Sequence, residues 1–93
     1  MQLDEFQELM ARTYGARDRA RGVDATIAWL AEELGELARA VRKGTRAEQI
    51  HEVGDVLAWL ASLTDQLGLS LADAAARYES GCPRCRAIPC ACP

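Results

Sequence analysis

Apolar residues recur every three or four positions along most of the chain, which is the period of an amphipathic helix. This pattern predicts a first helix over residues 3–14 that ends at Gly15, followed by an arginine-rich connection over residues 16–22. A second helix is predicted from Asp24, a good N-cap, to Gly44. Its expected core face is an apolar stripe of Ile27, Leu30, Leu34, Leu37 and Val41.

Capping residues predict two further helices. Thr45 and Glu48 have the spacing of a capping box, and the helix after them carries a stripe of Ile50, Val53, Leu57, Leu60, Thr64 and Leu67. Ser70 and Asp73 indicate a short, alanine-rich fourth helix that runs to about Tyr78. Since no segment alternates with period two, the sequence predicts an all-α fold, a four-helix bundle with a central antiparallel helix pair.

Length and composition limit the number of domains and the class of protein. We expect one all-α domain over residues 1–81, followed by a cysteine-rich tail over residues 82–93. The core of so short a chain is modest, so oligomerisation or a metal staple is expected to add stability. The net charge of −3 gives no sign of a nucleic-acid-binding protein, and no apolar run approaches the ~20 residues of a membrane span. With no signal-peptide pattern among its first residues, the chain is expected to be cytoplasmic.

Acidic residues are placed symmetrically about Gly44. Glu36 and Glu52 lie eight residues before and after this glycine, and Glu33 and Asp55 lie eleven residues before and after it. Because a short turn makes two helices antiparallel neighbours, the four acids should come level with one another. A single pair of acids three residues apart usually marks a solvated helix face, whereas two matched pairs favour a site. Converging carboxylates repel unless a cation lies between them, so the pattern predicts a Mg²⁺ site for a polyphosphate substrate.

Two tryptophans and several basic residues lie near these acids in the predicted hairpin. Trp29 and Trp59 lie fifteen residues before and after Gly44, so they come level about one turn beyond the acids. Their rings either wall a pocket for a nucleotide base or pack in the core or a subunit interface. Candidate phosphate and substrate contacts are Lys43, on nearly the same face as the acids, and Arg17 and Arg21 before the second helix.

Two segments that carry these acids resemble a known family signature. Glu32-Glu33-Leu34-Gly35-Glu36 and, fifteen residues later, Glu52-Val53-Gly54-Asp55 are similar to the EExxE…ExxD motif of MazG-like nucleotide pyrophosphohydrolases, an all-α superfamily. The similarity extends over residues 3–78 and implies a MazG-like bundle. It also implies hydrolysis of a nucleoside triphosphate to monophosphate and pyrophosphate with Mg²⁺ or Mn²⁺, in a homodimer or a dimer of dimers.

The resemblance also assigns roles to individual acids. It implies that Glu33, Glu36, Glu52 and Asp55 ligate the metal. Glu32 would be an accessory ligand or would help to orient the attacking water. Among alternative metals, a di-iron carboxylate site is disfavoured because it requires a histidine three residues after a glutamate. The one histidine, His51, is instead adjacent to Glu52 and is expected to be an ordinary, partly exposed residue.

Two alternative functions follow from the same residues. One is a non-catalytic helical module that senses a nucleotide or docks a partner, and the other is phosphoribosyl-ATP pyrophosphohydrolase activity, which belongs to the same superfamily. The four acids favour an enzyme, because an interaction module has no need of them.

The tail over residues 82–93 has three prolines and four cysteines and is not expected to form regular structure. Its cysteines fall in a Cys82-Pro83-Arg84-Cys85 knuckle and a Cys90-Ala91-Cys92 pair. Four thiolates are able to enclose one structural Zn²⁺. Disulfides, reduced thiols or another metal are the alternatives, and the absence of a histidine from the tail argues against a catalytic role.

Overall fold

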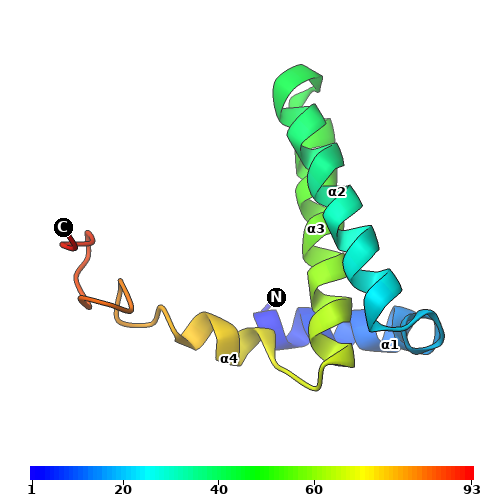
Figure 1. Cartoon of the computed structure of the whole chain (residues 1–93), viewed down its shortest axis with the longest axis horizontal. Coiled ribbons are helices and arrows are strands. Elements are labelled where there is room, and N and C mark those ends of the chain that lie inside the picture. The colour runs from blue at the N-terminus through cyan, green and yellow to red at the C-terminus, as the bar shows by residue number, and fades with distance from the viewer.

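The chain consists of four α-helices and no strands in the computed structural model, which describes residues 1–93. The helices are α1 (Leu3–Arg21), α2 (Val23–Lys43), α3 (Arg46–Gln66) and α4 (Leu71–Ala76). α2 and α3 form a long antiparallel hairpin, and α1 crosses the open end of this hairpin (Figure 1). The predicted all-α fold with four helices and a central antiparallel pair is therefore confirmed. None of these helices combines the length and the hydropathy that crossing a bilayer requires.

The first helix is longer than predicted. Gly15 does not end α1, which continues to Arg21, so the expected connection over residues 16–22 is wrong. Arginine is a good helix former, and a single glycine costs a helix only ~1 kcal/mol. The chain leaves the helix at Gly22, whose φ of +90° suits glycine and whose N–H donates to the Asp18 carbonyl. Gly22 is also the N-cap of α2, so Asp24 lies in the first turn and is not the cap.

Two of the three predicted N-caps are present. The Thr45 hydroxyl accepts a hydrogen bond from the Glu48 N–H at 3.2 Å, and the Ser70 hydroxyl accepts one from the Asp73 N–H at 3.1 Å. These bonds satisfy N–H groups that have no partner within a helix, so they start α3 and α4 at defined positions. α4 ends at Ala76, two residues earlier than expected.

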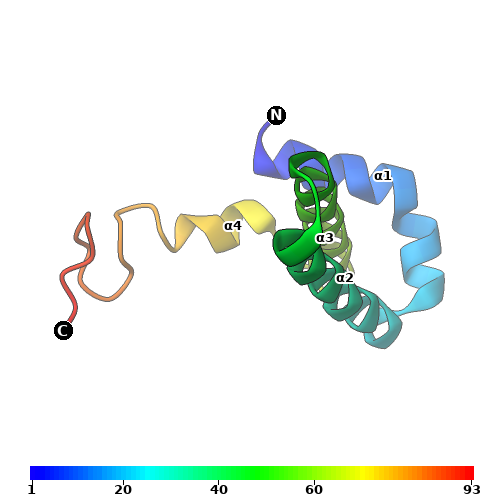
Figure 2. The ribbon, with the colours of Figure 1, turned by 90° about the horizontal axis from the view of Figure 1, so that it is seen from above.

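Side-chain hydrogen bonds tie the elements together at the open end of the hairpin. Thr26 on α2 is fully buried, donates to the Gly22 carbonyl and accepts from the Gln66 amide of α3 at 2.8 Å. Gln7 on α1 donates to the Leu69 carbonyl and accepts from the Leu71 N–H, both at 2.8 Å. The second pair of bonds anchors the start of α4 to α1, whereas the tail after α4 leads away from the hairpin (Figure 2).

The single chain has a small core. Only nine of its 93 residues are buried, and its accessible surface is 6845 Å², against about 5,300 Å² for a compact monomer of this mass. Its radius of gyration of 15.4 Å likewise exceeds the ~12 Å of a compact domain. The stripes predicted to face the core are largely exposed; Val41 on α2 and Ile50 on α3 are 64% and 69% exposed. The hairpin therefore presents apolar surface that its own chain does not cover.

Candidate active site

Carboxylates from α2 and α3 converge in the hairpin. Glu33, Glu36 and Glu52 each place a carboxylate oxygen within 4.8 Å of the others. The first two come from successive turns of α2, and Glu52 faces them from α3. Because α2 and α3 are joined only by Gly44 and Thr45, residues at equal distances from the turn come level. The structure thus brings together three of the acids that the spacing about Gly44 predicts to meet.

The fourth acid, Asp55, lies beside Glu52 and a histidine. His51 Nε2 lies 3.2 Å from Asp55 Oδ2 and 3.9 Å from Glu52 Oε1, and these three side chains form a second group of potential ligands. Glu52 is therefore shared by both groups. His51 is exposed, as expected, but it contacts the acids, which sequence reasoning missed. The signal was its spacing of four residues from Asp55, which places both on one helix face.

The environment of the acids disfavours their charged forms. The pKa of Glu33 is raised mainly by burial. Repulsion from Glu36, and then from Asp55 and Glu52, raises it further. Burial and repulsion from Glu36 and Asp55 likewise raise the pKa of Glu52, against an opposing effect of His51. These two acids are therefore easier to protonate than an ordinary glutamate.

Two carboxylate oxygens at this site have no hydrogen-bond partner. Oε2 of Glu33 and Oε2 of Glu52 are both buried and unpaired, although nearly all buried polar atoms in proteins are paired. An unpaired buried carboxylate oxygen is costly, and a hard divalent cation with oxygen ligands removes that cost. The donor set and its orphaned atoms therefore fit a cation of the Mg²⁺ type.

A hollow of about 410 Å³ lies beside the acids at the turn end of the hairpin. Glu36 and Glu52 line it together with two basic residues of α2, Arg39 and Lys43. Lys43 was predicted to be near the acids, and Arg39 was not. Arg39 follows Glu36 by three residues, so the helical period was the available signal for it.

A second hollow of about 250 Å³ lies on the other side of the acids, between α1 and α3. Asp55 and Trp59 of α3 line it, and the last turns of α1 contribute Tyr14, Arg17, Asp18 and Arg21. Arg21 Nη1 contacts the buried Asp18 Oδ1 at 2.7 Å. The two predicted arginines reach this hollow because α1 remains helical past Gly15. Tyr14 and Asp18 were missed, because their helical spacing extends into the segment expected to be a connection.

The two tryptophans lie against each other. The rings of Trp29 and Trp59 are stacked at 14° with their centroids 5.9 Å apart, and the Arg21 guanidinium lies 4.8 Å from the Trp59 ring centre. A base held between two parallel rings needs about 7 Å between the ring planes. The rings therefore do not form two opposite walls of one slot. Trp29 is 46% exposed, so the exposed aromatic surface lies mainly on this residue.

Comparisons with known proteins agree with this geometry. A family model described as the MazG nucleotide pyrophosphohydrolase domain matches residues 21–80. The chain belongs to this family. The phosphoribosyl-ATP pyrophosphatase of Leptospira biflexa is 33% identical over 73 residues, covering 78% of this chain and 79% of that protein. The uncharacterized protein YvdC of Bacillus subtilis is 38% identical over 90 residues, covering 78% of this chain and 85% of that protein.

Family membership makes the chain a pyrophosphohydrolase. The match covers the whole hairpin, and with it every acid of the two ligand groups. Glu32 of this MazG-family chain is exposed and is not among the converging carboxylates.

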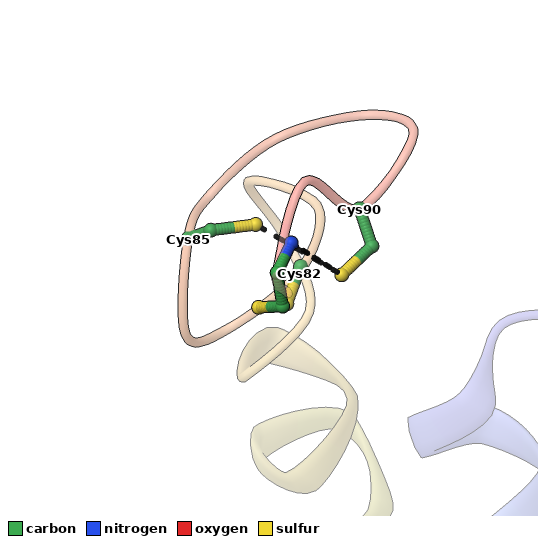
Figure 3. Close-up of side chains that lie close together, drawn as sticks. Cys82, Cys85 and Cys90 are labelled. Atoms are coloured by element: carbon green, nitrogen blue, oxygen red, sulfur yellow. Dashed lines mark hydrogen bonds between the residues drawn. The ribbon is translucent and has the colours of Figure 1, made fainter.

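The four cysteines lie outside the matched residues and form a cluster of their own (Figure 3). The N–H groups of Ala91 and Ala87 donate to the Cys85 sulfur and lower the pKa of this thiol to about 6. Hydrogen bonds to the neighbouring sulfurs of Cys90 and Cys82 raise the pKa of Cys92 to about 11. The MazG-family chain therefore has two separate clusters of potential metal ligands: the acids of the hairpin with the adjoining His51, and the four cysteines of the tail.

Proposed function

We propose that this chain hydrolyses a nucleoside triphosphate to the nucleoside monophosphate and pyrophosphate, in a reaction that depends on Mg²⁺ or Mn²⁺. The observation that carries the proposal is the pair of buried, unpaired carboxylate oxygens on Glu33 and Glu52. A helix surface that only binds a partner protein has no need of such a costly arrangement. Within a family of nucleotide pyrophosphohydrolases, the arrangement supports catalysis over a non-catalytic sensing or docking module.

The acids divide into ligands and supporting residues in this proposal. Glu33, Glu36, Glu52 and Asp55 would hold the divalent cation. When bound, such a cation polarises phosphoryl oxygens and lowers the pKa of a coordinated water. Glu32, at the exposed edge of the site, would act as an accessory ligand or orient the attacking water.

The two hollows suggest how a nucleotide lies across the acids. Lys43 and Arg39 supply positive charge on the turn side, where it would neutralise phosphate oxygens. On the opposite side, the exposed face of Trp29 would stack on the base. Arg17 and Arg21 line the adjoining hollow and would contact the sugar or a phosphate. The cleaved bond would then lie over the acids, between the two groups of basic residues.

A second candidate substrate is phosphoribosyl-ATP. The relative from Leptospira biflexa, which is named for this activity, is 33% identical over 73 residues. Hydrolysis of phosphoribosyl-ATP releases the same pyrophosphate, so the metal ligands would be shared. Only the groups that contact the base and the additional ribose phosphate would differ.

We further propose that the chain acts as a homodimer or a dimer of dimers. The exposed apolar stripes of α2 and α3 support this, because their largely exposed residues, among them Val41 and Ile50, need a covering surface. Light scattering coupled to gel filtration should give at least twice the mass of the 10.1 kDa chain. Ile50→Glu should shift the population towards monomer, whereas a monomeric wild type would contradict the assembly alone.

The proposed activity is tested by incubating the protein with Mg²⁺ and a panel of nucleoside triphosphates, deoxynucleoside triphosphates and phosphoribosyl-ATP. Pyrophosphate and monophosphate products are measured together, because a phosphatase would release orthophosphate instead. Glu36→Gln and Asp55→Asn should each abolish turnover while circular dichroism shows an unchanged helical content. Glu8→Gln, which alters an exposed glutamate of α1 in the same way, should retain full activity.

The outcome of this assay distinguishes between the two candidate substrates, and it also shows whether the chain is an enzyme at all. Turnover of phosphoribosyl-ATP alone would replace the triphosphate substrate and keep the site. Failure of a folded oligomer to release pyrophosphate from any compound would overturn the proposed activity. Full activity in both Glu36→Gln and Asp55→Asn would show that the metal ligands lie elsewhere.

A further inference from the structure

We propose that the tail binds one tetrahedral Zn²⁺ through the thiolates of Cys82, Cys85, Cys90 and Cys92. This site is separate from the acids of the hairpin and lies beyond residues 21–80, which match the MazG domain. It is independent of the proposed activity. Four observations on the tail support it: the sulfur spacing, the hydrogen bonds to sulfur, the turn geometry and the local charge.

The sulfur atoms already have the spacing of ligands that share one ion. All four lie within 4.8 Å of one another, with Cys82 Sγ 3.7 Å from Cys92 Sγ and Cys85 Sγ 4.0 Å from Cys90 Sγ. A tetrahedral Zn²⁺ with Zn–S bonds of about 2.3 Å places its sulfurs about 3.8 Å apart. Bonded sulfurs of a disulfide are only about 2.05 Å apart, and all four cysteines are free. The arrangement is therefore that of four ligands around a centre.

Backbone N–H groups point at the sulfur atoms. The Ala91 N–H donates to Cys85 Sγ at 3.3 Å, and the Cys92 N–H donates to Cys90 Sγ at 3.4 Å. Figure 3 shows Cys82, Cys85 and Cys90 turned towards one another inside the loop. N–H donors stabilise a thiolate over a thiol, and thiolate is the form that binds a metal. The bond from Ala91 to Cys85 also connects the two halves of the tail, so all four ligands belong to one folded unit.

The turn around the first two cysteines is tight and depends on special backbone conformations. Gly81 has a φ of +99°, and a Cβ at this position would lie 2.6 Å from Ile88 Cγ1 and 2.8 Å from the Ala87 carbonyl oxygen. Arg86 adopts a φ of +60°, which is uncommon for a residue other than glycine, and its N–H donates to the Cys82 carbonyl at 2.6 Å. Strained backbone of this kind persists only where its surroundings hold it. No apolar core is available here, since Ile88 is 83% exposed, and a central ion would supply the missing constraint.

The charges of the tail suit a tetrathiolate complex. Zn²⁺ with four thiolates carries a net charge of −2, and residues 82–93 contain two arginines, Arg84 and Arg86, but no acid. Both arginines flank Cys85. Soft thiolate ligands select Zn²⁺ over Mg²⁺, whereas the carboxylates of the hairpin select Mg²⁺. The two clusters are thus matched to different ions and should not exchange them.

The test measures metal in the full-length, untagged protein, purified with a phosphine reductant and kept reduced. We expect one zinc per chain, retained through gel filtration in excess Mg²⁺. After removal of zinc, Co²⁺ should bind with the intense visible absorption of a tetrahedral thiolate complex, and added Zn²⁺ should bleach it. A thiol reagent should modify all four cysteines quickly only after chelation of the zinc.

Variants locate the site. Cys85→Ser and, separately, Cys92→Ser should each lose most of the zinc and the cobalt absorption, whereas Ser80→Ala, the matched control beside the tail, should keep both. Zinc bound equally by wild type and both cysteine variants would overturn the proposal, because its binding would then not depend on the tail cysteines. Less than about half a zinc per reduced chain after reconstitution with Zn²⁺ would also overturn it, as would an iron–sulfur spectrum in the purified protein.

Discussion

The hairpin and the tail each gather a set of metal-ligand side chains, but they do so in opposite ways. In the hairpin, Glu33, Glu36, Glu52 and Asp55 are positioned by two helices, which hold the acids near one another although two of their oxygens lack partners. In the tail, four cysteines come from one irregular loop whose few hydrogen bonds run largely to the ligands themselves. A helical scaffold that stays folded without its ion can leave coordination positions open for a substrate. A loop organised by its ion uses all four positions for protein ligands, which is the pattern of a structural site.

Replacing one acid should have the largest effect and should affect only the hairpin. Glu52 belongs to both ligand groups, so Glu52→Gln should lower kcat/KM about a thousandfold, corresponding to several kcal/mol of lost transition-state stabilisation. Zinc content, measured by mass spectrometry on the same sample, should stay at one per chain. A parallel loss of zinc would show that the two regions are coupled and do not bind their ions independently.

Truncating the exposed tryptophan should have a smaller effect on the same region. Trp29→Ala removes the exposed ring of the stacked pair and should raise KM about tenfold, the cost of one lost base–aromatic stack, with little change in kcat. Steady-state kinetics on the preferred nucleotide measure this. Tyr78→Ala alters an exposed aromatic residue outside the hairpin and serves as the control. An unchanged KM for Trp29→Ala would assign the ring pair to packing.

Metal-free protein should become less stable as the pH rises. The folded-state pKa values of Glu33 and Glu52 are raised above 4.5, so above this pH the folded chain binds more protons than the unfolded chain. Stability conferred by these protons is lost as the pH rises through the folded-state pKa values. Thermal melts in the presence of a chelator should therefore give a falling melting temperature, and Mg²⁺ should restore it at neutral pH.

The variant that removes both acids shows whether they cause this trend. Glu33→Gln combined with Glu52→Gln should flatten the dependence of melting temperature on pH. A melting temperature of the metal-free wild type that rises steadily with pH above pH 4.5 would contradict the assignment of the two raised pKa values.

Removing a zinc ligand should have the smallest effect on turnover. Cys82→Ser lies in the tail, which leads away from the hairpin, so kcat/KM should change by no more than about twofold, as expected for a surface change remote from the site. The assay is the same one used for Glu52→Gln. A large loss of activity would show that the tail contributes to catalysis, for instance through a second copy of the chain.

The sequence predicts that the acids of the hairpin meet, because helices convert spacing into position. Gly44 and the Thr45 cap mark the turn, and the constant rise of a helix then brings Glu36 level with Glu52. The contact of His51 was not predicted because its partner is not a glutamate but an aspartate four residues later. The cluster of four sulfurs was also predictable, because its ligands lie close together in the chain.

Two features depended on tertiary packing and were beyond the pattern alone. Gly15 resembles a helix end, but burial of Asp18 and its contact with Arg21 accompany an α1 that continues through it. The apolar stripe that includes Val41 was expected to face the core, but Val41 is 64% exposed in the single chain, and the hydrophobic period does not say which surface covers it. A hydrophobic period indicates that a helix face needs a covering surface, and only the packed structure shows which surface covers it.

The two-residue connection between α2 and α3 sets the rotational phase of one helix against the other. One inserted residue would turn α3 by about 100° and slide it by about 1.5 Å, which separates the facing acids without altering any of them. The connection also resists substitution, since a Cβ at Gly44 would lie 2.8 Å from the Ala40 carbonyl oxygen. The length and backbone of this turn are therefore as strictly constrained as the acids. A change of length after α4, in contrast, would leave the alignment of those acids intact.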